Sequence, residues 1–170
     1  MPTNANGWPH PVGTDKVIDG DNAIKALADA LPGRGGVEAT ATDSVTVPNA
    51  AWTGVSVGTA GASYGAGWRT DATSPIIDVP GWWQVDLSVT WAAGGIGRRG
   101  LGWGAAGVAP TAFAQQIVSV SGTGTVSQVT QKWSGAFYFA AASRCQLWVY
   151  HDSGATISVT NRRIAIRRVF

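Results

Sequence analysis

The residue types of a serine-hydrolase triad stand side by side at His151, Asp152 and Ser153. A working triad needs the three side chains to point at one another in series. Neighbouring residues at the end of a strand instead diverge, because successive side chains point to opposite faces. The run Asp152-Ser153-Gly154 is typical of a hairpin turn. We therefore expect no catalytic triad at this position.

A second candidate is the segment 102–107, GWGAAG, whose glycine spacing matches a dinucleotide-binding loop. Such a loop holds the pyrophosphate of a cofactor at the N-terminus of a following helix. Here Pro110 and then a strand-like run follow instead. The segment is predicted to be a loop between strands, and no cofactor is expected.

Carboxylate, thiol and metal chemistry also lack partners in this sequence. Glycoside hydrolysis needs two carboxylates that flank one bond, and residues 44–170 contain only isolated aspartates and no glutamate. The acids of this region are Asp71, Asp78, Asp86 and Asp152. Cys145 is the single cysteine, and His10 and His151 are too few for a zinc site. We expect no enzymatic activity, no metal and no cofactor.

The composition is typical of a protein that covers its surface with copies of itself or with neighbours. Charged residues make up 13% of the chain, against about 25% in average proteins, and there are nine tryptophans. The basic residues are mostly paired arginines rather than a lysine-rich stripe, so nucleic-acid binding is not expected. The sequence shows no signal peptide and no apolar run of about 20 residues, so no membrane insertion is expected.

The clearest element is the stretch 81–91, in which apolar and polar residues alternate. Alternation with period two indicates a long, half-buried antiparallel strand. One face is apolar and comprises Trp83, Val85, Leu87, Val89 and Trp91. The opposite face is mostly polar and comprises Trp82, Gln84, Asp86, Ser88 and Thr90. Nine or ten such runs after residue 43, with no helical pattern between them, predict an antiparallel sandwich or barrel.

The first 36 residues have a different pattern. Residues 1–20 are rich in turns, and residues 21–31 place Ile24, Leu27 and Leu31 on one apolar helical stripe. Pro32-Gly33 would end this helix. We predict an N-terminal segment at 1–36, with a short helix at about 21–31, and a β domain at 44–170. The stripe is compatible with packing onto the chain's own domain and with holding a partner.

Three stretches of the β region resemble the C1q/TNF-like jelly-roll family. They are 80–89, PGWWQVDLSV; 145–150, CQLWVY; and 163–170, RIAIRRVF. The resemblance implies a ten-stranded antiparallel sandwich that forms compact homotrimers. It also implies a trimer interface on the outward residues of the first two stretches. These residues are Trp82, Gln84, Asp86, Trp148 and Tyr150.

Residues 7–28, GWPHPVGTDKVIDGDNAIKALA, resemble the leader of minor tail and fibre-like proteins from phages of actinobacteria. The resemblance implies a virion protein that is assembled in the host cytoplasm and is attached to the particle through this leader. The implied anchor residues are Trp8, Pro9, Pro11, Ile24, Leu27 and Leu31.

Together these resemblances predict a trimeric minor tail or tail-tip component whose β domain contacts the host surface. A capsid decoration or head-fibre protein is one alternative, and a secreted C1q/TNF-like ligand is another. Tyr64, Trp68 and Trp103 are the predicted receptor contacts, because their rings could stack on the sugars of a host polysaccharide. The competing interpretation is that these rings plug the ends of the sandwich.

Overall fold

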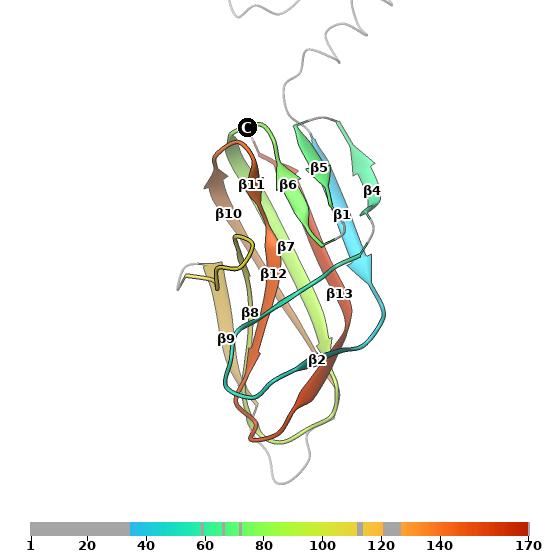
Figure 1. Cartoon of the computed structure of the whole chain (residues 1–170), viewed down its shortest axis with the longest axis vertical. Helices are drawn as coiled ribbons and strands as arrows, with labels where there is room; N and C mark the ends of the chain where they lie inside the picture. Colours follow the sequence, from blue (N-terminus) through green and yellow to red (C-terminus); the bar gives the residue numbers. More distant parts are fainter. Residues whose placement is uncertain are drawn as a thin grey trace, which may run out of the picture.

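The computed structural model describes residues 35–58, 60–65, 67–71, 73–111, 114–120 and 127–169. Within these ranges the chain forms β-strands in two facing layers (Figure 1). The predicted helix and the whole predicted anchor lie outside the described residues. That anchor comprises Trp8, Pro9, Pro11, Ile24, Leu27 and Leu31.

The central strand, β7, runs from Gly81 to Trp91 as predicted. All five of its inward side chains are at most 2% exposed: Trp83, Val85, Leu87, Val89 and Trp91. Strand β10 (Val129–Phe139) pairs with one edge of β7, and β13 (Ile157–Arg168) pairs with the other. The alternation in the sequence thus marks a strand in the middle of a sheet, with one face in the core.

This layer, called the β7 sheet below, has the strand order β10-β7-β13-β1-β4, with all pairings antiparallel. It includes β1 (Gly36–Ala41) and β4 (Ala60–Tyr64). Strand β2 (Val45–Val47) pairs with residues 157–159, at the N-terminal end of β13. Strand β1 begins at Gly36, the last residue of the predicted N-terminal segment, and continues into residues 37–41, which lie between the two predicted segments. The buried Val37 and Ala39 therefore make this stretch part of the β domain.

The facing layer, called the β12 sheet, has the order β3-β12-β8-β9. Its strands are β3 (Thr53–Val55), β12 (Gln146–His151), β8 (Gly97–Gly104) and β9 (Gln115–Val120). A small third sheet closes one end with the order β11-β6-β5. It consists of β5 (Trp68–Thr70), β6 (Pro75–Ile77) and β11 (Ser143–Arg144).

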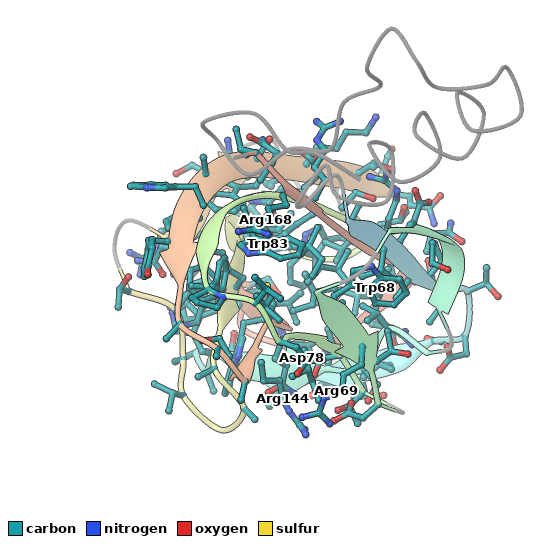
Figure 2. All side chains as sticks on the ribbon, turned by 90° about the horizontal axis from the view of Figure 1, so that it is seen from above. Trp68, Arg69, Asp78, Trp83, Arg144 and Arg168 are labelled. Carbon is teal, nitrogen blue, oxygen red and sulfur yellow. The ribbon has the colours of Figure 1, made fainter. Side chains whose placement is uncertain are left out.

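The core lies between the β7 and β12 sheets. Leu101, Leu147 and Val149 of the β12 sheet face the inward residues of β7 and are fully buried. Figure 2 shows Trp83 and Trp68 inside the ring of strands. Burial also raises the pKa of the Cys145 thiol above its ordinary value, so this cysteine is held as a neutral apolar side chain.

Two arginines among the described residues are buried, although arginine is usually exposed. Arg162 follows Asn161, whose φ of 44° lies where β13 changes register. The Arg162 guanidinium donates from Nε to the carbonyl of Ser56 at 2.8 Å, and from Nη1 and Nη2 to the carbonyl and carboxylate of Asp43 at 2.6 and 2.7 Å. Arg99 lies 5.6 Å from the Trp91 ring centroid and donates to the carbonyl of Gly95. The hydrogen bonds of both guanidinium groups hold segments between strands, at Asp43, Ser56 and Gly95, against the sandwich.

Candidate functional site

The outward side of the β7 sheet carries the predicted interface residues of β7, namely Trp82, Gln84 and Asp86. Residues of β10, β13 and β1 lie beside them on the same side. Directly paired residues of an antiparallel ladder share a face, so the registers define this surface, called the β7 face below. Its members are Trp82, Gln84, Asp86, Ser88, Lys132, Ser134, Ala136, Tyr138, Arg163, Ala165, Arg167 and Glu38.

Asp86 is the centre of a polar network on the β7 face. Its carboxylate accepts hydrogen bonds from Ser134 Oγ at 2.5 Å and from Gln84 Nε2 at 3.2 Å, and it pairs with Arg167 at 3.2 Å. The Gln84 amide also donates to Ser134 Oγ. The sequence-predicted residues Gln84 and Asp86 are therefore held in fixed positions, with Asp86 25% exposed.

A second ion pair lies beside this network. Arg163 donates from Nη2 to Glu38 Oε2 at 2.8 Å, and this hydrogen bond lowers the pKa of Glu38 although partial burial acts against it. Next to the pair is a hollow of about 490 Å³. Asp86, Lys132 and Arg163 lie among the residues that line it. The β7 face thus carries charges of both signs around a concave region.

One end of the β7 face is aromatic and exposed. Trp82 is 46% exposed and Tyr138 is 62% exposed, and their rings meet edge to face with centroids 6.2 Å apart. Val169, which is 42% exposed, donates its backbone N–H to the carbonyl of Trp82 at 2.9 Å. Tyr138 was not singled out from the sequence, although the alternation of β10 places it on the same face as Lys132.

Trp148 and Tyr150 do not lie on the β7 face. Both belong to β12, which pairs with β3 and β8 in the opposite sheet. The expectation that they share one surface with Trp82 is wrong, because alternation gives the parity within a strand but not the sheet to which the strand belongs. Trp148 is 8% exposed, and Tyr150 packs against Trp52 with ring centroids 5.5 Å apart.

The structure distributes the predicted receptor contacts over three strands. Trp103 lies within β8 rather than in a loop, and its ring is 4.6 Å from Phe139 and 5.0 Å from Phe137, measured between centroids. Trp68, in β5, also packs against the core. Both arrangements match the competing interpretation that these indoles fill the sandwich. Tyr64 is paired with Gly36 in β4, and its side chain lies outside the described part.

The residues His151, Asp152 and Ser153 do not form a relay. Asp152 accepts hydrogen bonds from the backbone N–H and the Nε of Arg98, both at 2.6 Å, and these bonds lower its pKa. His151 is fully buried. Its Nε2 lies 2.9 Å from the Val47 carbonyl, so Nε2 carries the hydrogen and Nδ1 accepts from Ser153 Oγ at 3.1 Å. The histidine therefore holds the turn against β2.

The glycine-rich segment 102–107 begins as a strand, not as a loop. Gly102 and Gly104 are the last outward positions of β8. A Cβ on Gly104 would lie 2.2 Å from the carbonyl oxygen of Val108, and one on Gly102 would lie 2.6 Å from that of Ala114. Glycine is required here because the β8–β9 connection folds back over the sheet, so the spacing that resembles a cofactor loop has a packing cause.

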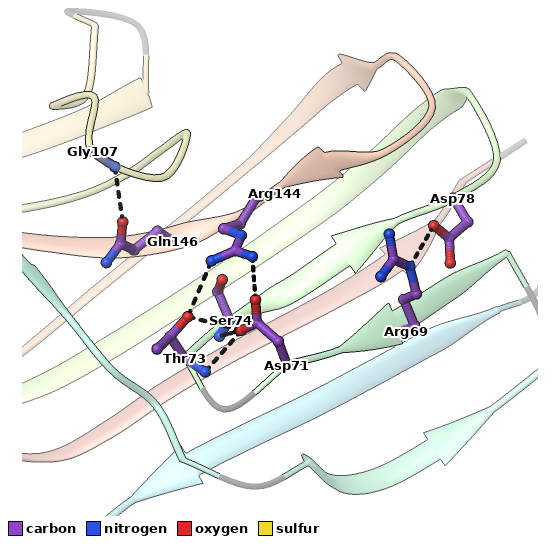
Figure 3. A network of polar contacts seen from close by, with 8 residues as sticks. All are labelled: Arg69, Asp71, Thr73, Ser74, Asp78, Gly107, Arg144 and Gln146. Carbon is purple, nitrogen blue, oxygen red and sulfur yellow. Dashed lines mark hydrogen bonds and ion pairs between the residues drawn. The ribbon is translucent and has the colours of Figure 1, made fainter.

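A polar cluster supports the small third sheet (Figure 3). Asp71 forms an ion pair with Arg144 and accepts hydrogen bonds from Thr73 N, Thr73 Oγ and Ser74 N at 2.8 to 2.9 Å. Although burial acts to raise it, the pKa of Asp71 is lowered by these bonds. The contacts close the turn between β5 and β6 and connect it to β11. They are typical of a structural turn.

Two further features concern metal binding and membrane crossing in the described part of the chain. Its residues include no group of three or more His, Cys, Asp or Glu placed to hold a metal ion. No helix among them has the length and hydropathy needed to cross a membrane.

Comparison with known proteins identifies the fold. No protein-family model and no curated protein matches the chain. Among solved structures, the Eiger TNF from S. frugiperda has a TM-score of 0.55 at 12% identity, covering 79% of this chain and 92% of that chain. Murine APRIL at pH 5.0 has a TM-score of 0.57 at 11% identity, covering 79% and 98%.

A phage protein has the same architecture. The PRD1 vertex protein P5 has a TM-score of 0.53 at 13% identity, covering 81% of this chain and 99% of that chain. Likeness at such low identity concerns the fold alone. The β domain of this chain is therefore an antiparallel jelly roll of the C1q/TNF-like type.

Proposed function

We propose that this chain is a structural protein of a phage particle, without catalytic activity of its own, and that its β domain assembles into a homotrimer through the β7 face. The observation that carries the proposal is the exposed pair of Trp82 and Tyr138 at the end of an otherwise ordered polar face. The C1q/TNF-like resemblance, which implies a homotrimer, supports the same surface.

The energetics favour covering this surface. Full burial of a large aromatic side chain removes on the order of 200 Å² from water, and burial of apolar area contributes roughly 25 cal/mol per Å². Trp82 still exposes 46% and Tyr138 62% of its surface, so an interface has only that remaining part to cover. The exposed Trp82 and Tyr138, whose rings contact each other, thus provide apolar surface that an interface would bury favourably. Aromatic residues are also the side chains that most often dominate binding energy.

The charges of the β7 face suit association with copies of itself. Glu38 and Asp86 supply negative charge, whereas Lys132, Arg163 and Arg167 supply positive charge on the same surface. A ring of three subunits brings one part of this surface against a different part on the neighbour. Positive groups of one subunit can then contact negative groups of its neighbour. Other ways of docking the subunits would bring like charges together and are therefore disfavoured.

The setting in a phage particle rests on the resemblance of residues 7–28 to tail-protein leaders. In this proposal the N-terminal segment attaches the trimer to the virion, and the β domain reaches toward the host surface. A second candidate is mounting on the capsid, as a decoration or head-fibre protein. Its support is the structural likeness to a phage protein described as a vertex protein.

The homotrimer is tested by size-exclusion chromatography with light scattering on the full chain at micromolar concentration. We expect three times the 17.5 kDa chain mass for the wild type, and dissociation when Trp82→Ala and Tyr138→Ala are combined. Ile96, 49% exposed outside the β7 face, provides the control: Ile96→Ala should remain trimeric. A monomeric wild type would refute the proposal, and so would a double variant that stays trimeric.

A further inference from the structure

We propose that the outward side of the β12 sheet carries a binding site for a neutral polysaccharide. In this site Trp52 and Tyr150 form the stacking surface, and the Arg98–Asp152 pair forms its polar edge. The inference specifies the host contact and rests on the proposed function for its biological setting. It differs from the receptor site expected from the sequence, because Trp68 and Trp103 pack against the core.

The rings of Trp52 and Tyr150 lie close to the backbone of the β12 sheet. Trp52 immediately precedes β3, and Tyr150 lies in β12, with their planes inclined by 40°. Gly100 of β8 has no side chain, and the Trp52 ring and the Cβ of Tyr150 occupy the space above it. A Cβ on that residue would lie 2.9 Å from both Cη2 of Trp52 and Cβ of Tyr150. The missing side chain lets both rings lie against the backbone, so they form a fixed and shallow aromatic surface.

The polar edge is equally fixed. Arg98 donates to Asp152 through its backbone N–H and its Nε, and its Cζ lies 6.0 Å from the Tyr150 ring centroid. The Arg98 side chain remains 56% exposed. Because the aspartate balances the charge of the arginine, the edge offers hydrogen-bonding groups without net charge. Such an edge suits hydroxyl groups better than phosphate or carboxylate groups.

The open part of the surface is a strip across four strands. Ile117 of β9 lies opposite Gly100 and is 43% exposed, so it continues the row formed by Trp52 and Tyr150. Strands lie about 4.8 Å apart, which makes the strip roughly 14 Å long. On the side of Gly102 and Gly104 the folded-back β8–β9 connection forms a wall.

The size and chemistry of this strip favour a sugar chain over a protein partner. Stable protein interfaces cover about 800 Å² on each partner, whereas the strip offers two half-buried rings and one aliphatic side chain. A sugar ring presents an apolar C–H face that stacks on an aromatic ring, and hydroxyls at its rim. The strip is carried by β12, β8 and β9, which form the layer opposite the β7 sheet (Figure 1), so trimerisation through the β7 face leaves it exposed.

Affinity electrophoresis of the full chain in native gels tests this site. The gels contain a soluble neutral glucan, mannan or galactan, and dextran sulfate serves as the polyanion control. We expect at least one neutral polymer to retard the wild type. Trp52→Ala should weaken this retardation at least about tenfold, as for a central aromatic contact, whereas Trp52→Phe should retain part of it.

The matched control uses a second exposed arginine–aspartate pair. Arg69 is 61% exposed and pairs with Asp78 at 2.9 Å, away from the strip. Arg98→Gln should weaken binding, and Arg69→Gln should leave it unchanged. Because both are exposed side chains, this comparison holds even if Trp52→Ala disturbs folding, which thermal melting would reveal.

Three results would overturn the site: no retardation by any neutral polymer, retardation by dextran sulfate alone, or equal effects of the two arginine variants. None of them changes the mass measured by light scattering. Failure of the polysaccharide site is therefore distinguishable from failure of the proposed trimer.

Discussion

Replacing the buried Arg162 with Met is predicted to destabilise the β domain by about 2–4 kcal/mol. The substitution keeps an unbranched side chain but removes the donors to the carbonyl oxygens of Ser56 and Asp43. A buried acceptor left without its donor costs about 1–3 kcal/mol. The two acceptors here are only part-buried, so each loss lies in the lower part of that range. The carboxylate of Asp43 adds little, because this side chain is 70% exposed and returns to water.

Equilibrium unfolding in urea measures this effect at one fixed protein concentration, because association changes apparent stability. The control is Arg69→Met, which breaks an ion pair on the surface and should cost at most about 1 kcal/mol. The reasoning fails if Arg162→Met shifts the free energy of unfolding by less than about 0.5 kcal/mol. It also fails if the two variants cost the same.

Two further predictions concern packing and pH. Gly104→Ala should destabilise the domain by about 1–3 kcal/mol, because the new methyl group would overlap the carbonyl of Val108. Gly61→Ala, whose methyl group meets an atom at 3.4 Å, should be nearly neutral in the same urea titration. The lowered pKa of Glu38 means that its pairing with Arg163 stabilises the fold above the ordinary pKa of 4.5 and is lost as the pH falls through the folded-state pKa. The difference in urea midpoint between wild type and Glu38→Gln should therefore be largest at neutral pH and shrink as the pH falls through the folded-state pKa, and a difference that stays constant in acid would contradict this.

The sequence was sufficient to predict the fold class, because its strongest signals are local. The alternation of residues 81–91 assigns the core face of β7 correctly, from Trp83 to Trp91. Polar and glycine-rich breaks between further strand-like runs exclude crossover helices in the β region. Period-two patterning depends only on neighbouring residues, so it can be interpreted without knowing which strands pair.

The arrangement of the candidate surfaces depends on pairing between distant strands, which the sequence does not reveal. Tyr150 has outward parity, as Trp82 does, but it lies in the opposite sheet because β12 pairs with β8. Arginine is usually exposed, but Arg162 is buried because two distant connections, at Asp43 and Ser56, bend over it and accept its hydrogen bonds. Trp103 was expected in a loop, whereas the long β8 carries it into the sandwich.

One signal for the aromatic strip was present in the sequence but was not used. Glycines at 100, 102 and 104 occupy alternate positions of one strand, which indicates that something other than their own side chains covers that face. The covering groups come from Trp52, Tyr150 and the β8–β9 connection. Only the fold shows which residues these are.

The proposed role in a virion is tested most directly by an electron-microscopy map of a phage particle whose genome encodes this chain. We predict a threefold density on the tail or at a capsid vertex into which three copies of the jelly roll fit, with the β7 faces toward the axis and the N-terminal segment toward the particle. A particle without such a density, or one in which single copies attach through the β7 face, would contradict it.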